Sequence, residues 1–320
     1  MWKTILRRFL VMIPQLFVLS LLIFIMAQFM PGDPFSGKIS PETDPNRIEE
    51  LREMYGLNDP WYQQYVRWIG NAAQGEFGTS YTYKRDVADL IGERAINTFW
   101  LSLLTTFLLY LIAVPLGVLA GRYQNSLFDR AVVLYSFVTY AIPTFVLALI
   151  FIYFFGFKLG WFPTSGSVDI RVENGTVGWY WSKIYHMLLP AITSALLGTT
   201  GVIQYLRTEV VDAKSMDYVR TARSKGVPVS KVYTRHIFRN SLLPIAAFLG
   251  FTITGLLGGS IFIETIFGYP GIGQLFISSI SSRDYSVITA LVMLFGFLTL
   301  LGSLLSDIIM TIVDPRIRID

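Results

Sequence analysis

Two carboxylates stand directly after long apolar segments, where an ionisable side chain could do chemistry. Glu264 follows the apolar segment 242–263, and Asp307 follows the segment 287–306. Placing a charge at membrane depth is costly, so an ionisable residue there is a functional candidate by default. Such a carboxylate can attract an amine or pair with a basic side chain, and the residues alone leave both roles open.

The segment 207–241 is the most strongly basic part of the chain. Asp217 is placed to cap a short helix that Gly226 would end at the C′ position, with Pro228 just beyond. Ser230 would cap a second short helix extending to residue 240. The sequence therefore predicts two helices joined at a Gly-Val-Pro corner.

The second of these helices is amphipathic. A basic stripe recurs every four residues, beside an apolar stripe with the same spacing. The basic stripe is Lys231, Arg235 and Arg239, and the apolar stripe is Val229, Tyr233 and Ile237. Such a pair of helices suits insertion into a partner, but a solvated basic loop explains the same residues equally well.

Several kinds of chemistry are excluded by residues that the sequence lacks. It contains no cysteine and two histidines, His186 and His236, so disulfides, thiolate chemistry and a histidine-built metal site are not expected. It has no Gly-x-x-x-x-Gly-Lys-Ser/Thr loop for a nucleotide, and no His-Glu-x-x-His or Gly-x-Ser-x-Gly pattern of a hydrolase. An intramembrane enzyme is therefore disfavoured, and the net charge of +4 does not indicate nucleic-acid binding.

The elements that position these residues are membrane helices. Of the 320 residues, 53% are hydrophobic and 15% are charged, and the mean hydropathy is +0.51. A helix needs about 20 mostly apolar residues to span a bilayer. Six segments meet this requirement, the last extending to about residue 313: 9–30, 97–121, 131–157, 187–206, 242–263 and 287–306. The sequence predicts an all-α, six-span protein whose first segment is a retained helix.

Lysine and arginine placement predicts the orientation. The N-terminus, the 122–130 and 207–241 loops and the C-terminal tail carry more basic residues than the loops on the other side. The more basic side is normally cytoplasmic. Both termini and the 207–241 loop are therefore predicted to be cytoplasmic, as an even number of spans requires.

The largest soluble piece, 31–94, is predicted to lie on the opposite side. Helical spacing occurs over 47–55 and 61–69, whereas 75–83 has the composition of a turn or short strand. A packed lid is the simpler interpretation, and a docking surface for an external partner is the alternative.

Motifs along the whole chain resemble one protein family. DYVRTARSKG at 217–226, followed by RHIFRNSLLP at 235–244, is similar to the EAA loop of ABC importer permeases, with Arg220 and Thr221 replacing a Glu and an Ala. Those replacements resemble the oligopeptide/dipeptide/nickel branch. The further matching segments occur in register and indicate its B-type subunit: PGDP at 31–34, YGLNDPWY at 55–62, GTSY at 78–81, IPTF at 142–145, GWFP at 160–163, ETIFGYPGIG at 264–273 and DPRIR at 314–318.

The resemblance implies the type I ABC importer permease fold in a prokaryotic inner membrane. The chain would comprise 1–30 with the first helix, the extracytoplasmic insert 31–94, and the core permease 95–320. Its implied partners are a second, C-type permease, two cytoplasmic ATPases and an extracytoplasmic substrate-binding protein, all working at the lipid bilayer without nucleic acid. ATP and Mg²⁺ would be bound by the ATPases, so no cofactor or catalytic residue is expected in this chain.

The resemblance also assigns candidate site residues. The 207–241 loop would couple to an ATPase through Asp217, Ala222, Ser224, Gly226, Val227, Arg235 and Arg239. Glu264 and Asp307 remain pathway or gate candidates: Glu264 could contribute to an outer gate or attract a peptide amine, and Asp307 could instead pair with a basic residue. The expected cargo is an oligopeptide or dipeptide. Nickel or another small solute is the alternative, and a passive channel is disfavoured because it needs no docking loop.

Overall fold

The computed structural model describes residues 2–29 and 58–313, and these form helices joined by short segments. In chain order the helices are α1 (Trp2–Phe29), α3 (Trp61–Ala73), α4 (Val87–Arg122), α5 (Leu127–Ala141), α6 (Thr144–Phe151), η1 (Ile152–Lys158), α7 (Val177–Ala213), α8 (Asp217–Ser224), α9 (Val229–Lys231), η2 (Val232–Ile237), α10 (Phe238–Ser241), α11 (Leu243–Gly255), α12 (Ile261–Ile266), α13 (Ile272–Ser282) and α14 (Tyr285–Val313). The predicted all-α class is confirmed.

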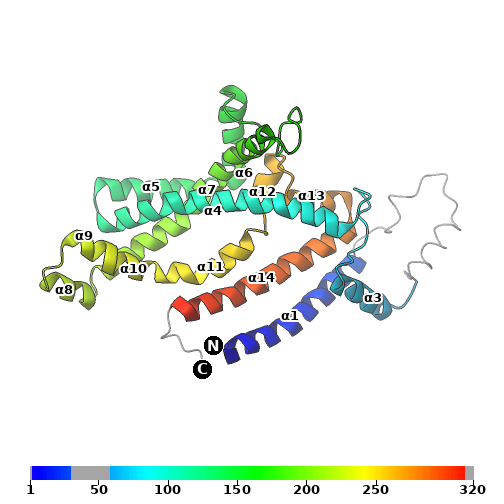
Figure 1. Ribbon diagram of the computed structural model, residues 1–320, viewed down its shortest axis with the longest axis horizontal. Coiled ribbons are helices and arrows are strands. Elements are labelled where there is room, and N and C mark those ends of the chain that lie inside the picture. The colour runs from blue at the N-terminus through cyan, green and yellow to red at the C-terminus, as the bar shows by residue number, and fades with distance from the viewer. Residues whose placement is uncertain (1, 30–57, 314–320) are drawn as a thin grey trace.

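The long helices α1, α4 and α14 run roughly along the longest axis of the molecule (Figure 1). The α8–α10 segment lies at one end of this axis, on the left, and α3 and α13 lie at the other end. The start of α1 and the end of α14 point toward the same end as α8–α10. The predicted coupling loop and the α3 region are thus at opposite ends of the helix bundle.

Two helices extend well beyond the apolar segments that predicted them. Asp86 caps α4 by accepting from the Ala88 and Asp89 amides at 2.7 and 3.4 Å, so the helix begins at Val87 instead of residue 97. Thr176 likewise caps α7 by accepting from the Trp179 amide. The domain boundary expected at 94/95 therefore falls inside α4, because a capped helix continues through polar residues.

The third apolar segment is not one straight span. The helices 127–141 and 144–158 meet at an angle of 100°. The break falls at Ile142 and Pro143, and Ile142 is extended with φ −84° and ψ 121°. A proline disfavours helical backbone in the residue before it, which favours ending the helix at this point.

The fifth apolar segment is also broken. The helix α11 ends at Gly255, and α12 begins at Ile261. Between them Gly259 has φ +68°, which glycine adopts without strain. Among the described helices, four are long and apolar enough to cross a membrane, or five if the bent pair counts as one span. The number six stays a prediction.

A close approach between α4 and α7 depends on two glycines. A Cβ atom at Gly117 would lie 2.9 Å from Leu206 Cβ, and one at Gly121 would lie 2.7 Å from Val210 Cβ. Small residues four apart allow two membrane helices to pack at such short distance. Gly117 and Gly121 therefore serve helix packing and do not line a pathway.

The region before α4 is described from residue 58. The predicted helix 61–69 is confirmed as α3 and extends to Ala73. The 75–83 segment forms turns, with an isolated antiparallel bridge between Thr79 and Asp86. The predicted helix 47–55 lies outside the described residues.

Candidate functional site

The 207–241 loop has a small hydrophobic core of its own. The fully buried side chains come from the end of α7, from α8 and from the α9–α10 region: Val210, Ala213, Val219, Ala222, Val232 and Ile237. Gly226 ends α8 with φ +74°, as predicted for a C′ glycine. The 207–241 loop is therefore folded around its own core, and is not a solvated basic loop without buried side chains.

Both predicted helix caps differ from the structure. The N-cap of α8 is Met216, and Asp217 is the first helical residue, 3.5 Å from Arg220. At this position the negative charge of the Asp217 carboxylate interacts favourably with the positive end of the helix dipole. Asp217 therefore stabilises the start of the helix without serving as its N-cap. Ser230 lies inside the second helix, which begins directly after Pro228.

The predicted apolar stripe of the second helix is wrong at Val229, which is exposed. Residues Val232–Ile237 form a π-helical turn, in which hydrogen bonds join residues five apart. This spacing places Val232 and Ile237 together in the core, at 0% and 1% exposure. Tyr233 is partly buried and packs against the same core.

Basic side chains attach this loop to the end of α4. Lys214 Nζ donates to the Arg122 carbonyl oxygen at 3.0 Å, and burial lowers the pKa of Lys214. The Arg122 guanidinium lies 4.8 Å from the centroid of the Tyr233 ring, within cation–π range. The end of α4 is therefore in contact with both the end of α7 and the second loop helix.

An ion pair with a buried carboxylate lies beside this attachment. Arg207 on α7 donates to Asp129 on α5 through Nε at 2.5 Å and Nη2 at 2.9 Å. The Asn125 amide also donates to the Asp129 carboxylate at 2.8 Å. A bidentate pair of this kind fixes the relative orientation of two helices. In the sequence Arg207 is one basic residue of the 207–241 loop, and nothing local indicates this pair, because Asp129 is 78 residues away.

The predicted coupling residues are not equally accessible. Ser224, Gly226 and the polar side chains Asp217, Arg235 and Arg239 are exposed. Val227 is half-buried, and Ala222 is 6% exposed within the loop core. Ala222 therefore positions the exposed residues and offers little surface of its own.

Three large apolar residues of the loop remain exposed and were not among the predicted coupling residues. They are Met216, Tyr218 and Val229. A sequence signal for this exposure exists. Small residues such as Ala213 and Ala222 fill the buried face of the loop, which leaves the larger apolar side chains on the opposite face. These side chains make the exposed surface of the loop partly apolar.

Glu264 is fully buried, and its carboxylate organises the α12–α13 segment. One oxygen accepts from the Thr98 hydroxyl at 2.9 Å, and the other accepts from the Gly273 and Gln274 amides at 2.6 and 3.1 Å. Thr98 Oγ1 in turn accepts from the Ile272 amide at 2.8 Å. A carboxylate from α12 and a hydroxyl from α4 thus satisfy the first amides of α13.

The neighbouring glycines leave room for this carboxylate. A Cβ atom at Gly271 would lie 2.4 Å from Glu264 Oε2, and one at Gly259 would lie 3.0 Å from Oε1. With both oxygens enclosed and hydrogen-bonded, Glu264 presents no free acceptor to a passing amine in this conformation. The arrangement supports a structural role in place of the predicted gate or amine attraction.

Asp307 forms an ion pair with a basic residue, which was one of the two roles predicted for it. Arg8 Nε lies 3.0 Å from Asp307 Oδ2, which joins the first helix to the last. Among the described residues, no group of three or more His, Cys, Asp or Glu side chains could hold a metal ion. The structure therefore brings together the loop residues but leaves Glu264 and Asp307 in separate contacts.

Comparison with known proteins gives consistent results along the whole chain. Residues 113–319 match the family described as binding-protein-dependent transport system inner membrane component. Residues 1–103 match the corresponding N-terminal family.

Curated relatives match over nearly their full length. The oligopeptide transport system permease protein AppB of Bacillus subtilis (strain 168) is 40% identical over 315 residues, 98% of each chain. The glutathione transport system permease protein GsiC of Escherichia coli (strain K12) is 34% identical over 318 residues, 99% of each chain. Among solved structures, an inward-facing MetNI methionine ABC transporter matches with a TM-score of 0.52 at 16% identity, over 70% of this chain and 96% of that one.

Proposed function

The chain belongs to the family of binding-protein-dependent transport system inner membrane components, and from this premise we propose how it works as a permease subunit of a peptide-type ABC importer. The observation that carries the proposal is the folded loop α8–α10. It has a buried core, an exposed surface of mixed apolar and basic character, and two attachments to the membrane helices.

In this proposal the loop is the contact with a cytoplasmic ATPase. The partner ATPases bind ATP and Mg²⁺, since this sequence has no phosphate-binding loop. Force from the ATPase reaches α4 through Lys214 and Tyr233, and reaches α5 through the Arg207–Asp129 pair. A second, C-type permease completes the translocation pathway.

The proposed orientation places both termini and α8–α10 in the cytoplasm of a prokaryotic cell. The basic loop residues and the positive-inside rule support this assignment. The opposite end, with α3 and α13, then faces outward and receives an external substrate-binding protein (Figure 1).

We propose an oligopeptide or dipeptide as the cargo. The names of the relatives support a peptide, since AppB is an oligopeptide permease and glutathione is itself a small peptide. Uptake of labelled mixed peptides and of nickel, compared in cells with and without the gene, tests this choice. Loss of peptide uptake alone agrees with the proposal, and loss of nickel uptake alone contradicts it.

The coupling contact is tested by cysteine crosslinking in the assembled transporter. Because the chain contains no cysteine, Ser224→Cys provides a single reactive site on the exposed end of α8. We expect a reagent with one thiol-reactive and one photoreactive group to join it to the ATPase and ATP to change the yield. Ser281→Cys is the matched control, since Ser281 is equally exposed but lies on α13 at the other end of the bundle.

Two results would contradict the contact. One is equal crosslinking of the ATPase by the Ser224→Cys and Ser281→Cys variants. The other is no ATPase adduct from Ser224→Cys in a complex that still hydrolyses ATP. A passive channel would instead continue to conduct solute after ATP depletion.

A further inference from the structure

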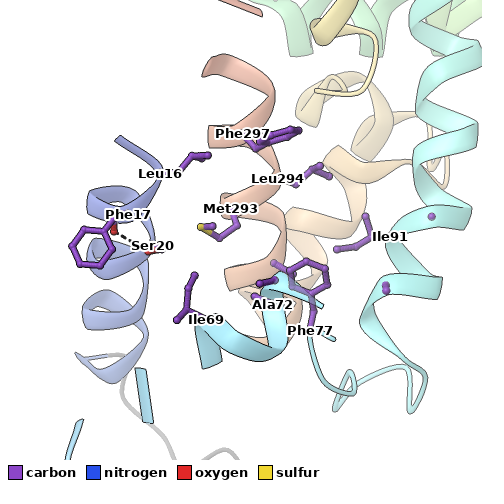
Figure 2. Close-up of a pocket in the computed structure, with 14 residues that line it drawn as sticks. Leu16, Phe17, Ser20, Ile69, Ala72, Phe77, Ile91, Met293, Leu294 and Phe297 are labelled. Carbon is purple, nitrogen blue, oxygen red and sulfur yellow. Dashed lines mark hydrogen bonds between the residues drawn. The ribbon is translucent and has the colours of Figure 1, made fainter. Parts of the chain in front are cut away.

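A cavity of about 590 Å³ lies between α1, α3, α4 and α14. Figure 2 shows Leu16 and Ile69 between α1 and α14, and Phe77 and Ile91 between α14 and α4. Among its fourteen lining residues, Ser20 is the only one with a polar side chain. The cavity is thus suited to a hydrocarbon ligand.

The single polar side chain is already satisfied. The Ser20 hydroxyl donates to the Phe17 carbonyl oxygen at 2.8 Å and lies 2.7 Å from the Tyr65 hydroxyl. A peptide backbone would bring amides and carbonyls that find no partner here, at a cost of about 1–3 kcal/mol for each buried group. Water is disfavoured for the same reason, because it needs two to four polar partners.

The cavity lies mainly in one half of the membrane. On α14 its lining starts at Ala290, five residues after the helix begins, and ends at Phe297. At 1.5 Å per residue these positions lie roughly 8–18 Å from that helix end. The hydrocarbon core is about 30 Å thick, with its midplane about 15 Å from either face, so the cavity lies mainly in the half away from α8–α10 and reaches just past the midplane. Under the orientation of the proposed function this is the outer leaflet.

The cavity is continuous with the outer surface of the helix bundle. Two of its lining residues, Phe17 and Phe297, are 56% and 43% exposed, and Ile13 continues this apolar flank along α1. The nearby helix α3 carries the exposed aromatics Trp61 and Tyr62. Exposed Trp and Tyr are typical of the membrane–water interface, which would place the opening beside the lipid acyl chains.

We propose that this cavity binds one acyl chain of a phospholipid from the outer leaflet. A cavity of about 150 Å³ lined by Leu, Ile and Phe holds one benzene, so the present volume accommodates roughly four such units, the size of a long alkyl chain. The chain would fill the space between α1–α3 and α4 and support both against α14. The assignment to the outer leaflet rests on the proposed function and its orientation, whereas the acyl-chain site itself does not.

Gly92 allows the cavity to be filled without disturbing the fold. It lines the cavity, and a Cβ atom built there meets nothing within 4 Å. Leucine also has a higher helix propensity than glycine, so Gly92→Leu should fold and place its side chain in the cavity. Gly70→Leu is the matched control, because Gly70 on α3 is equally unobstructed but does not line the cavity.

The experiment uses the full transporter in vesicles of phosphatidylethanolamine and phosphatidylglycerol. A phosphatidylethanolamine with a diazirine within its acyl chain is photoactivated, and labelled peptides are located by mass spectrometry. We expect labelling of 88–92 and 290–297 in the unmodified protein and in Gly70→Leu, and its loss in Gly92→Leu. Peptide-stimulated ATP hydrolysis by the same vesicles tests the proposed function separately.

Three results would overturn the lipid site. The first is unchanged labelling of these segments in Gly92→Leu. The second is crosslinking of the segments to a helix of the second permease, which would then fill the cavity. The third is their labelling by a peptide cargo that carries a photoreactive aromatic side chain, with no labelling by the lipid.

Discussion

The buried carboxylate of Glu264 gives the sharpest prediction about stability. Replacing Glu264 with alanine removes the acceptor for the Gly273 and Gln274 amides and for the Thr98 hydroxyl. Each buried donor left without a partner costs about 1–3 kcal/mol, so the loss should total roughly 3–5 kcal/mol. Glu264→Gln keeps one acceptor oxygen, and its expected cost is about 1–2 kcal/mol.

Thermal unfolding of the assembled transporter in detergent measures these costs. We expect the melting temperature to fall in the order wild type, Glu264→Gln, Glu264→Ala. Glu93→Ala is the control, because Glu93 pairs with Arg85 on the surface, where both side chains are more than half exposed. Surface pairs contribute about 0–1 kcal/mol, so this variant should melt close to the wild type.

A second measurement separates this structural role from attraction of a peptide amine. If Glu264 attracted the amine, Glu264→Gln would raise the KM of peptide uptake and leave the melting temperature unchanged. That result would refute the assignment of Glu264 to the α12–α13 fold. A melting temperature of Glu264→Ala equal to that of Glu93→Ala would refute it as well.

Two other contacts give testable expectations. Asp129→Ala leaves Arg207, whose side chain is 22% exposed, without its bidentate partner and should cost about 1–3 kcal/mol; adding Arg207→Leu should restore part of the loss, and the absence of any restoration in a thermal melt would argue against the pair. Gly121→Leu places a side chain where Val210 Cβ lies 2.7 Å from the first added atom, so the complex should assemble poorly on size-exclusion chromatography, whereas Gly201→Leu, with nothing within 4 Å, should assemble normally.

Local signals predicted much of the coupling loop. Gly226 was expected to end a helix, and it does so with a positive φ, because few other residues adopt that backbone at low cost. The helix α3 was likewise visible in the spacing of Trp61, Tyr65 and Trp68. The pattern failed in the second loop helix, because a π-helical turn changes the spacing of the buried positions and no local residue signals it.

The ends and breaks of the membrane helices were harder to predict. Hydropathy found the apolar part of α4 and missed its first turns, which depend on the Asp86 cap and on burial of Val87 and Leu90. Pro143 was visible in the sequence, but the 100° bend depends on how the two halves pack.

The sequence by itself determined the class of the protein, the apolar segments and the family, because these depend on composition and on motifs within single stretches of chain. Only the tertiary structure decided what the charged residues do. Glu264 meets Thr98 across 166 residues, Arg207 meets Asp129 across 78, and Asp307 meets Arg8 between the last helix and the first. Whether a carboxylate is free in a pathway or enclosed in a contact depends on which distant donors reach it. Helix packing brings those donors to the carboxylates, and the spacing of residues within one segment does not predict which helices pack together.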